Sequence, residues 1–337
     1  MPPPAPQPGV IPLRPLATGE VLGGAFGTFR RYWKPLIGVM AAVQGIGILL
    51  VAAAFALTFA AAHDRFAAVF DLAPGESPEG SDVAAFFLSF VPAGVVLLLV
   101  MTTGAAMFGA LCPAVIQEAV LGRPATFGSM WRRSCSRLPS VLGAVLLTAL
   151  IAGGPALVPY AICIPLVIVN TDLDGSGPPA AFGLLLLGSL LCVPFSVWLM
   201  ARFSLAPAAA VCEGLGPVAA LRRSSRLVRD GWWRVFGISM LGYVVATAVG
   251  YAIQMPFGFV GMFGLFPALP GPDGPAAEPG TLILGFLVYG AAMLLGGVIS
   301  SLFQFSFPQL VVALIYVDQR MRKEDFAATL TSAASPA

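Results

Sequence analysis

Six long stretches of the sequence contain no Asp, Glu, Lys or Arg, and this feature constrains the fold more than any other. They are residues 35–63, 83–117, 138–171, 175–201, 235–272 and 279–317. Each stretch is longer than the roughly 20 apolar residues that cross a hydrocarbon core. Because lipid offers no water to backbone amides, a crossing segment must satisfy its hydrogen bonds within a helix or a closed barrel. The stretches lack the alternation of barrel strands, so we expect helices.

The composition supports a membrane protein. Hydrophobic residues make up 58% of the 337 residues and charged residues only 10%, against about 25% charged in a typical soluble domain. This deficit of charge excludes a water-soluble enzyme domain, a disordered chain and a nucleic-acid-binding protein. We therefore predict an all-α, polytopic bundle of six transmembrane helices. The predicted spans are about 35–62, 84–112, 140–169, 180–202, 235–264 and 281–317.

Basic residues concentrate on one side of these spans. Seventeen of the 18 Lys and Arg residues lie in segments 1–34, 118–137, 202–234 and 318–337. The three intervening loops hold nine acidic residues and one base, Arg65. Since Lys and Arg near span ends stay in the cytoplasm, this distribution predicts one crossing per stretch and both termini in the cytoplasm. The rich use of Ala, Gly, Pro and Arg suggests a bacterium, and hence a bacterial cytoplasmic membrane.

Pro and Gly mark the remaining parts of the chain. Residues 1–16 are rich in Pro and lack the basic start of a signal peptide, so we expect a short disordered extension. Residues 17–326 form the predicted membrane domain, and 327–337 a disordered tail. Residues 265–280 predict an extracytoplasmic loop because their Pro and Gly content cannot stay helical. Gly153, Gly154, Pro155 and Pro159 could break the third stretch, but a second crossing there would place basic clusters outside.

Three parts of the sequence resemble one another. Arg pairs at 30–31, 132–133 and 222–223 each precede an odd-numbered span, and each even-numbered span ends in an acid. This pattern predicts three copies of an interfacial amphipathic helix followed by a helical hairpin. Thr18 and Thr126 are predicted N-caps, and Pro217 fits a first helical position. Trp232 and Trp233 follow the third helix at the predicted membrane interface, where Trp is enriched.

The candidate site is a ring of charges at the cytoplasmic ends of the spans. We predict that three acids, Glu118, Glu213 and Asp318, face the arginines Arg132, Arg133, Arg222, Arg223 and Arg226. Arg229 completes the basic face of the third amphipathic helix. Two interpretations remain open. The charges either anchor the helices at the interface by snorkelling and ion pairing, or the surplus arginines bind anionic lipid headgroups.

Other polar and small residues within the spans predict helix packing. Gln44, Gln254 and Gln304 are expected to form hydrogen bonds between helices, or to line a substrate pathway. Small residues recur at helical spacing and predict close helix contacts, with broken-helix binding sites as the functional alternative. They are Gly242, Ala246, Gly250, Gly285, Gly290, Gly296 and Gly297.

Three stretches carry a family resemblance: residues 11–16 with Gly19 and Glu20, residues 213–224 with 233–237, and residues 315–324. They resemble the bacterial membrane-protein family of the glycerophosphoryl diester phosphodiesterase membrane domain, over roughly residues 11 to 326. The resemblance implies a multi-helix membrane module without an established activity of its own. Some members join it to a catalytic barrel whose chemistry needs two histidines and an acidic metal site. His63 is the only histidine in this chain, so we expect the membrane module alone.

Catalytic motifs are not visible in the sequence. There is no HExxH, no Cys/His cluster, no phosphate-binding GxxxxGK[ST] and no GxSxG, so we expect no metal, no cofactor and no enzymatic activity. We predict a non-enzymatic membrane module that organises or anchors partners at the inner leaflet, with anionic phospholipid as one partner and no identified protein partner. The alternatives are a transporter or lipid-translocating permease and, third, an intramembrane enzyme. A polar cavity between the helices would favour transport.

Overall fold

The computed structural model describes residues 14–63, 65, 80–120, 122, 124–170, 179–266 and 279–324. These residues are helical apart from short turns and connections, and six of their helical segments are long and apolar enough to cross a membrane. The predicted all-α bundle with six spans is therefore confirmed. Most of the predicted N-terminal extension, the C-terminal tail 327–337 and nearly all of the loop 265–280 lie outside the described residues.

The helices follow one another along the chain with few interruptions. They are α1 (Thr18–Arg31), α2 (Trp33–Ala61), α4 (Gly80–Ser89), α5 (Val91–Val120), α6 (Phe127–Thr148), α7 (Gly154–Asn170), α8 (Pro179–Phe203), α9 (Ala206–Glu213), α10 (Pro217–Val228), α11 (Trp232–Leu265) and α12 (Pro279–Lys323). The second and third predicted spans were too short at their charged ends. Hydrogen bonding within the helix does not stop where the apolar stretch stops, so α5 runs on to Val120 and α6 begins at Phe127.

The three predicted units differ at their first helix. In the first and third units, α1 and α10 are separate helices that end before α2 and α11 begin. In the second unit, α6 runs without interruption from the amphipathic segment into the span, although Pro139 lies inside it. The predicted separate interfacial helix is thus wrong for this unit. Pro139 bends or weakens a helix without necessarily ending it, because only one backbone hydrogen bond is lost.

Two of the three predicted helix starts are confirmed. The Thr126 hydroxyl accepts a hydrogen bond from the Ser129 N–H at 3.4 Å, as an N-cap should, and α10 begins at Pro217. Thr18 is wrong as an N-cap, because α1 includes Thr18 and its N-cap is Ala17. There the Glu20 carboxylate reaches back and accepts the Ala17 N–H at 2.7 Å. A carboxylate on the first turn therefore replaces the threonine hydroxyl.

A π-helical turn, Ala149–Gly153, joins α6 to α7 at the predicted break. Pro155 has no N–H to donate, and its ring would clash with the carbonyl of Ile151 in a regular α-helix. Widening the turn to the π form accommodates the proline without reversing the chain. The segment 138–170 therefore remains one continuous run of helical turns, without a reversal of the chain.

The bundle is tightly packed at one end only. We call this the basic end; it is formed by α1, the start of α6, α9, α10 and the final turns of α5 and α12, which contact one another. Eleven successive residues of α5, from Ala106 to Ile116, are buried there. Residues 310–318 of α12 are also all buried. A helix buried on every side belongs to a protein core, so α5 and α12 form the centre of the basic end.

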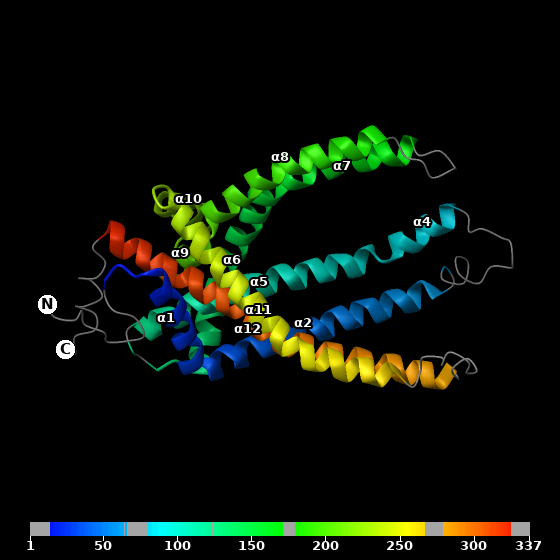
Figure 1. The fold of residues 1–337 in the computed structure, drawn as a ribbon, viewed down its shortest axis with the longest axis horizontal. Helices are drawn as coiled ribbons and strands as arrows, with labels where there is room; N and C mark the ends of the chain where they lie inside the picture. The colour runs from blue at the N-terminus through cyan, green and yellow to red at the C-terminus, as the bar shows by residue number, and fades with distance from the viewer. Residues whose placement is uncertain are drawn as a thin grey trace.

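Away from the basic end the hairpins separate. In Figure 1, the α7–α8 hairpin and the outer parts of α11 and α12 extend on opposite sides of α2 and α5. Large apolar side chains on these outer parts face outward, with Leu57 72%, Leu186 74% and Phe286 63% exposed. Such continuous apolar exposure suits contact with lipid chains, because leaving so much apolar surface in contact with water would be unfavourable.

Glycines allow the helices of each hairpin to approach closely. A Cβ on Gly47 would lie 2.8 Å from Val100, and one on Gly188 would lie 2.9 Å from Pro159. The predicted packing role is confirmed for Gly242 and Gly250 on α11 and for Gly296 on α12, which contact the opposite helix. Gly290 is different, since a Cβ there would meet no atom within 4 Å.

Candidate functional site

Asp318 is the most deeply buried charge at the basic end, with 0% of the residue exposed. Its carboxylate accepts hydrogen bonds from Arg322 Nε at 3.0 Å and from Arg234 Nη2 at 3.2 Å. It also accepts the Leu16 backbone N–H at 2.8 Å. Burying a carboxylate is costly unless it is paired and hydrogen-bonded, and three donors from three segments meet this requirement.

The same cluster holds the N-terminal segment in place. The Leu16 carbonyl accepts hydrogen bonds from Arg234 Nη2 at 2.6 Å and from Arg322 Nη2 at 2.9 Å. The Leu16 side chain is fully buried in the core. Leu16 was predicted to be the last residue of a disordered extension, and this prediction is wrong for Leu16. Residues 1–13 of that extension lie outside the described residues. Asp318 thus joins α11 and α12 to the segment before α1.

Glu213, the last residue of α9, centres a second cluster. Arg223 donates to it from Nε at 2.9 Å, and the Tyr316 hydroxyl donates to the same carboxylate oxygen at 2.5 Å. Arg223 also binds Glu324 at the end of α12. The hydrogen bond with Glu324 is the main cause that raises the pKa of the Arg223 guanidinium, and Arg223 in turn lowers the pKa of Glu324. These pairs fasten α10 to α9 and α12.

Glu118, near the end of α5, forms the third cluster. Arg133 Nη1 donates to its carboxylate at 2.8 Å, and Arg133 Nη2 also donates to the Gln117 side chain. The Arg133 side chain remains 40% exposed, so this pair stabilises the fold by about 1 kcal/mol at most. It connects the end of α5 to the amphipathic part of α6.

Two of the three predicted acids form ion pairs with predicted arginines. Arg133 binds Glu118 and Arg223 binds Glu213. Asp318 is different, because its partners are Arg234 and Arg322, which were not among the predicted site residues. The spacing from Asp318 to Arg322 is i to i+4 on one helix and could have revealed that pair.

Nine basic side chains at the basic end have no carboxylate within 4.0 Å among the described residues. They are Arg30, Arg31, Lys34, Arg132, Arg137, Arg202, Arg222, Arg226 and Arg229. In the same part of the structure, each of the six described carboxylates has a basic partner: Glu20, Glu118, Glu213, Asp230, Asp318 and Glu324. The predicted site arginines thus divide into pairing residues, Arg133 and Arg223, and surplus residues, Arg132, Arg222, Arg226 and Arg229.

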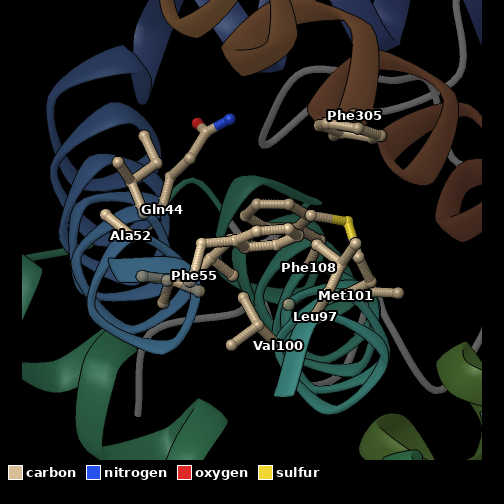
Figure 2. Close-up of a pocket in the computed structure, with 14 residues that line it drawn as sticks. Gln44, Ala52, Phe55, Leu97, Val100, Met101, Phe108 and Phe305 are labelled. Atoms are coloured by element: carbon tan, nitrogen blue, oxygen red, sulfur yellow. The ribbon is translucent and has the colours of Figure 1, made fainter. Parts of the chain in front are cut away.

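An apolar cavity of about 490 Å³ lies between α2, α5 and α12. Figure 2 shows the rings of Phe55, Phe108 and Phe305 around it, with Gln44 at its edge. Gln44 Nε2 donates to Ser301 at 2.6 Å, while Gln44 Oε1 is buried without a hydrogen-bond partner. The cavity contains no charged side chain, so it suits an apolar group such as a lipid chain better than a polar solute.

The amides of the spans behave mostly as predicted. Gln44 binds Ser301, and Gln254 donates to the Met293 carbonyl at 3.3 Å and accepts from Ser300 at 3.2 Å. Both therefore join separate helices through hydrogen bonds. Gln304 instead lies against the backbone at Gly250, where any Cβ would overlap its side chain.

Within the described residues, no group of three or more His, Cys, Asp or Glu side chains could hold a metal ion. The single histidine, His63, is exposed just beyond the end of α2, far along the chain from the acids of the basic end. The basic end is therefore a site rich in arginine rather than in metal ligands.

Comparison with known proteins places the chain in a family. The Domain of unknown function (DUF7847) matches residues 16–282, which is most of the chain. No curated protein matches this sequence, and no solved structure matches it either. The finer resemblance to the glycerophosphoryl diester phosphodiesterase membrane domain stays a prediction. With six candidate spans, the chain is a multi-pass membrane protein that belongs to the DUF7847 family.

Proposed function

We propose that this protein is a non-enzymatic membrane module that anchors or organises partners at the inner leaflet through contact with anionic phospholipid. The observation that carries the proposal is the surplus of nine basic side chains at one end of the bundle, where the described carboxylates are all paired. Basic ends of membrane helices stay in the cytoplasm. There each Lys or Arg near an anionic surface contributes about 1 kcal/mol of attraction.

The paired charges support the same proposal in another way. Asp318 and Glu213 fasten α10, α11, α12 and the Leu16 segment together. This cross-linking holds the surplus arginines of α10 on a fixed surface instead of on a flexible loop. Because the helix that carries these arginines is already held in place, its backbone loses little freedom when lipid binds, and such preorganisation favours affinity.

Lipid selectivity in a bilayer tests the proposal. We expect spin-labelled phosphatidylglycerol to contact the reconstituted protein at least about twofold more than spin-labelled phosphatidylcholine, because the attraction is electrostatic. The preference should disappear in about 1 M salt, where the Debye length is ~3 Å. The triple variant Arg30→Gln, Arg132→Gln, Arg222→Gln should reduce the preference. The single variant Arg65→Gln, which removes one charge at the opposite end, should leave the preference unchanged. Equal contact of both lipids with the wild-type protein would refute the proposal.

A lipid-translocating permease is the second candidate, and the apolar cavity beside Gln44 favours it. A path for a lipid chain between α2, α5 and α12 would have an apolar lining of this kind. Transport of a polar solute receives no such support, because the cavity lining is apolar. Fluorescent lipid in the inner leaflet of proteoliposomes separates the two candidates. Rapid exposure of that lipid to an external reductant would favour the permease, and a rate equal to protein-free vesicles would favour the anchor.

A further inference from the structure

A pocket of about 520 Å³ lies where α8, α10 and α11 meet. Its walls are Trp198 and Arg202 from the end of α8, Arg226, Val228 and Arg229 from α10 and its C-cap, and Trp232 from the start of α11. We call it the Trp198–Trp232 pocket. Its volume falls in the range of small-molecule sites, about 300–1,000 Å³.

Hydrogen bonds fix the walls of the pocket. The Ser224 hydroxyl donates to the Arg202 carbonyl at 2.8 Å and accepts the Leu205 N–H at 3.2 Å, which docks α10 on the junction of α8 and α9. Trp232 Nε1 donates to the Trp198 carbonyl at 3.2 Å, which docks α11 on α8. The three helices therefore present the pocket without needing a ligand to assemble it.

Aromatic contacts orient the side chains of the pocket. The Arg202 guanidinium lies 5.1 Å from the centre of the Trp198 ring, a cation–π contact. The Trp232 ring stacks on Phe236 at 5.0 Å. Trp233 beside it is 79% exposed. Tryptophans in this pattern are typical of the headgroup level of a membrane, so we expect the pocket to lie at the level of the lipid phosphates.

The charge inside the pocket is not compensated. Arg202, Arg226 and Arg229 have no carboxylate within 4.0 Å among the described residues. The nearest acid along the chain, Asp230, binds Lys323 Nζ at 2.8 Å instead, and this hydrogen bond is the main cause that lowers its pKa. Arg229 contributes only a smaller, longer-range part of this pKa shift, so Lys323 and not a pocket arginine forms the ion pair with Asp230. Three guanidinium groups remain without an anionic partner.

We propose that the Trp198–Trp232 pocket binds a phosphate group, with Arg202, Arg226 and Arg229 as its ligands. Guanidinium forks match the oxygens of phosphate and bind them with charge-assisted hydrogen bonds. A phospholipid headgroup and a soluble phosphate share this chemistry, and the headgroup level of the tryptophans favours the lipid. The inference rests on the proposed function, because an anionic inner leaflet would supply the headgroup, but it assigns that contact to one site.

Native mass spectrometry of the full chain in a neutral detergent tests the pocket. The probes are short-chain phosphatidylglycerol, short-chain phosphatidylcholine and inorganic phosphate. We expect the wild-type protein to retain one phosphatidylglycerol about tenfold more tightly than phosphatidylcholine. Arg202→Gln and Arg229→Gln should each weaken this binding about tenfold, since each removes a charge-assisted contact. Arg229 is exposed, so its variant keeps the test valid even if Arg202→Gln does not fold.

The control removes two arginine charges outside the pocket, one more than each test variant. The variant Arg30→Gln, Arg132→Gln alters exposed arginines on α1 and α6 and should keep the tightly bound phosphatidylglycerol while it lowers selectivity in bilayers. Unchanged binding in Arg229→Gln would overturn the pocket but leave the proposed function intact, provided that bilayer selectivity persists. Equal contact of both lipids in bilayers would instead refute the proposed function. Retention of inorganic phosphate with no retained lipid would support the phosphate site and assign it to a soluble ligand.

Discussion

Replacing Asp318 with asparagine should lower the free energy of unfolding by about 2–3 kcal/mol. This is less than the about 3–5 kcal/mol lost when one partner of a fully buried ion pair is removed, because the Arg234 and Arg322 side chains remain 31% and 36% exposed to solvent. The carboxylate is fully buried and receives donors from Arg234, Arg322 and the Leu16 backbone. Asparagine has nearly the same shape but carries no charge, so two guanidinium groups would remain near the core without their anion. Thermal unfolding in detergent, followed by a thiol-reactive dye, measures the loss because Cys112 and Cys163 are buried in the folded protein.

The matched control for this experiment is Asp230→Asn. Asp230 also forms an ion pair, with Lys323 at 2.8 Å, but its side chain is 76% exposed. Exposed ion pairs contribute little to stability because solvent screens them, so this variant should unfold close to the wild-type temperature. Asp318→Asn should also expose the chain near Leu16 to protease, whereas Asp230→Asn should not. Equal unfolding temperatures for the two variants would contradict the role assigned to Asp318.

Replacing Gly296 with valine should separate α11 from α12 and lower the free energy of unfolding by about 1–3 kcal/mol, as is usual for overpacking. A Cβ at this position would lie 2.6 Å from the Phe257 Cβ and 2.7 Å from its Cγ. These atoms are close to the backbone of α11, so a rotamer change of Phe257 cannot relieve the overlap and the helices must move apart. The same thiol-reactive unfolding experiment measures the effect.

Gly290 supplies the control on the same helix. A Cβ there meets no atom within 4 Å, and the residue is exposed. Gly290→Val therefore introduces the same side chain into α12 without a steric cost from α11. The pair of variants separates packing from the lower helix propensity of valine. A similar loss of stability in both would show that propensity, and not the contact with Phe257, limits the position.

The six-span helical architecture could be predicted from the sequence because a bilayer permits few kinds of backbone structure. Charge-free stretches longer than a membrane is thick must be helices, and the absence of charge is visible without any knowledge of contacts. Pro217 and Thr126 were also predictable, since each acts within one turn of its own helix. Thr18 was assigned wrongly because Glu20, also nearby, takes over the capping of α1. Either the Thr18 hydroxyl or the Glu20 carboxylate could cap this helix, and the sequence alone does not show which of the two reaches the backbone N–H groups.

The parts that the sequence missed depend on residues far apart along the chain. Leu16 and Asp318 are separated by 302 positions, and their hydrogen bond exists only because α12 returns to the basic end. The Trp198–Trp232 pocket likewise joins three helices, and only Arg226 and Arg229 among its lining residues were predicted site residues. Glu118 and Arg133 are only 15 positions apart, on consecutive helices joined by a short connection, so the sequence could place them near each other. Contacts between helices that are far apart along the chain could not be predicted in this way.

The divergence of the hairpins gives the molecule a different cross-section at its two ends. Near α5 and α12 the side chains are close-packed, whereas farther out three apolar hairpins stand apart and meet lipid around their circumference. In a bilayer, we expect one monolayer to surround a single packed end of the protein and the other to surround three separate hairpins and fill the space between them. The protein would then occupy different areas in the two monolayers, and we expect its insertion to depend on the local curvature of the membrane.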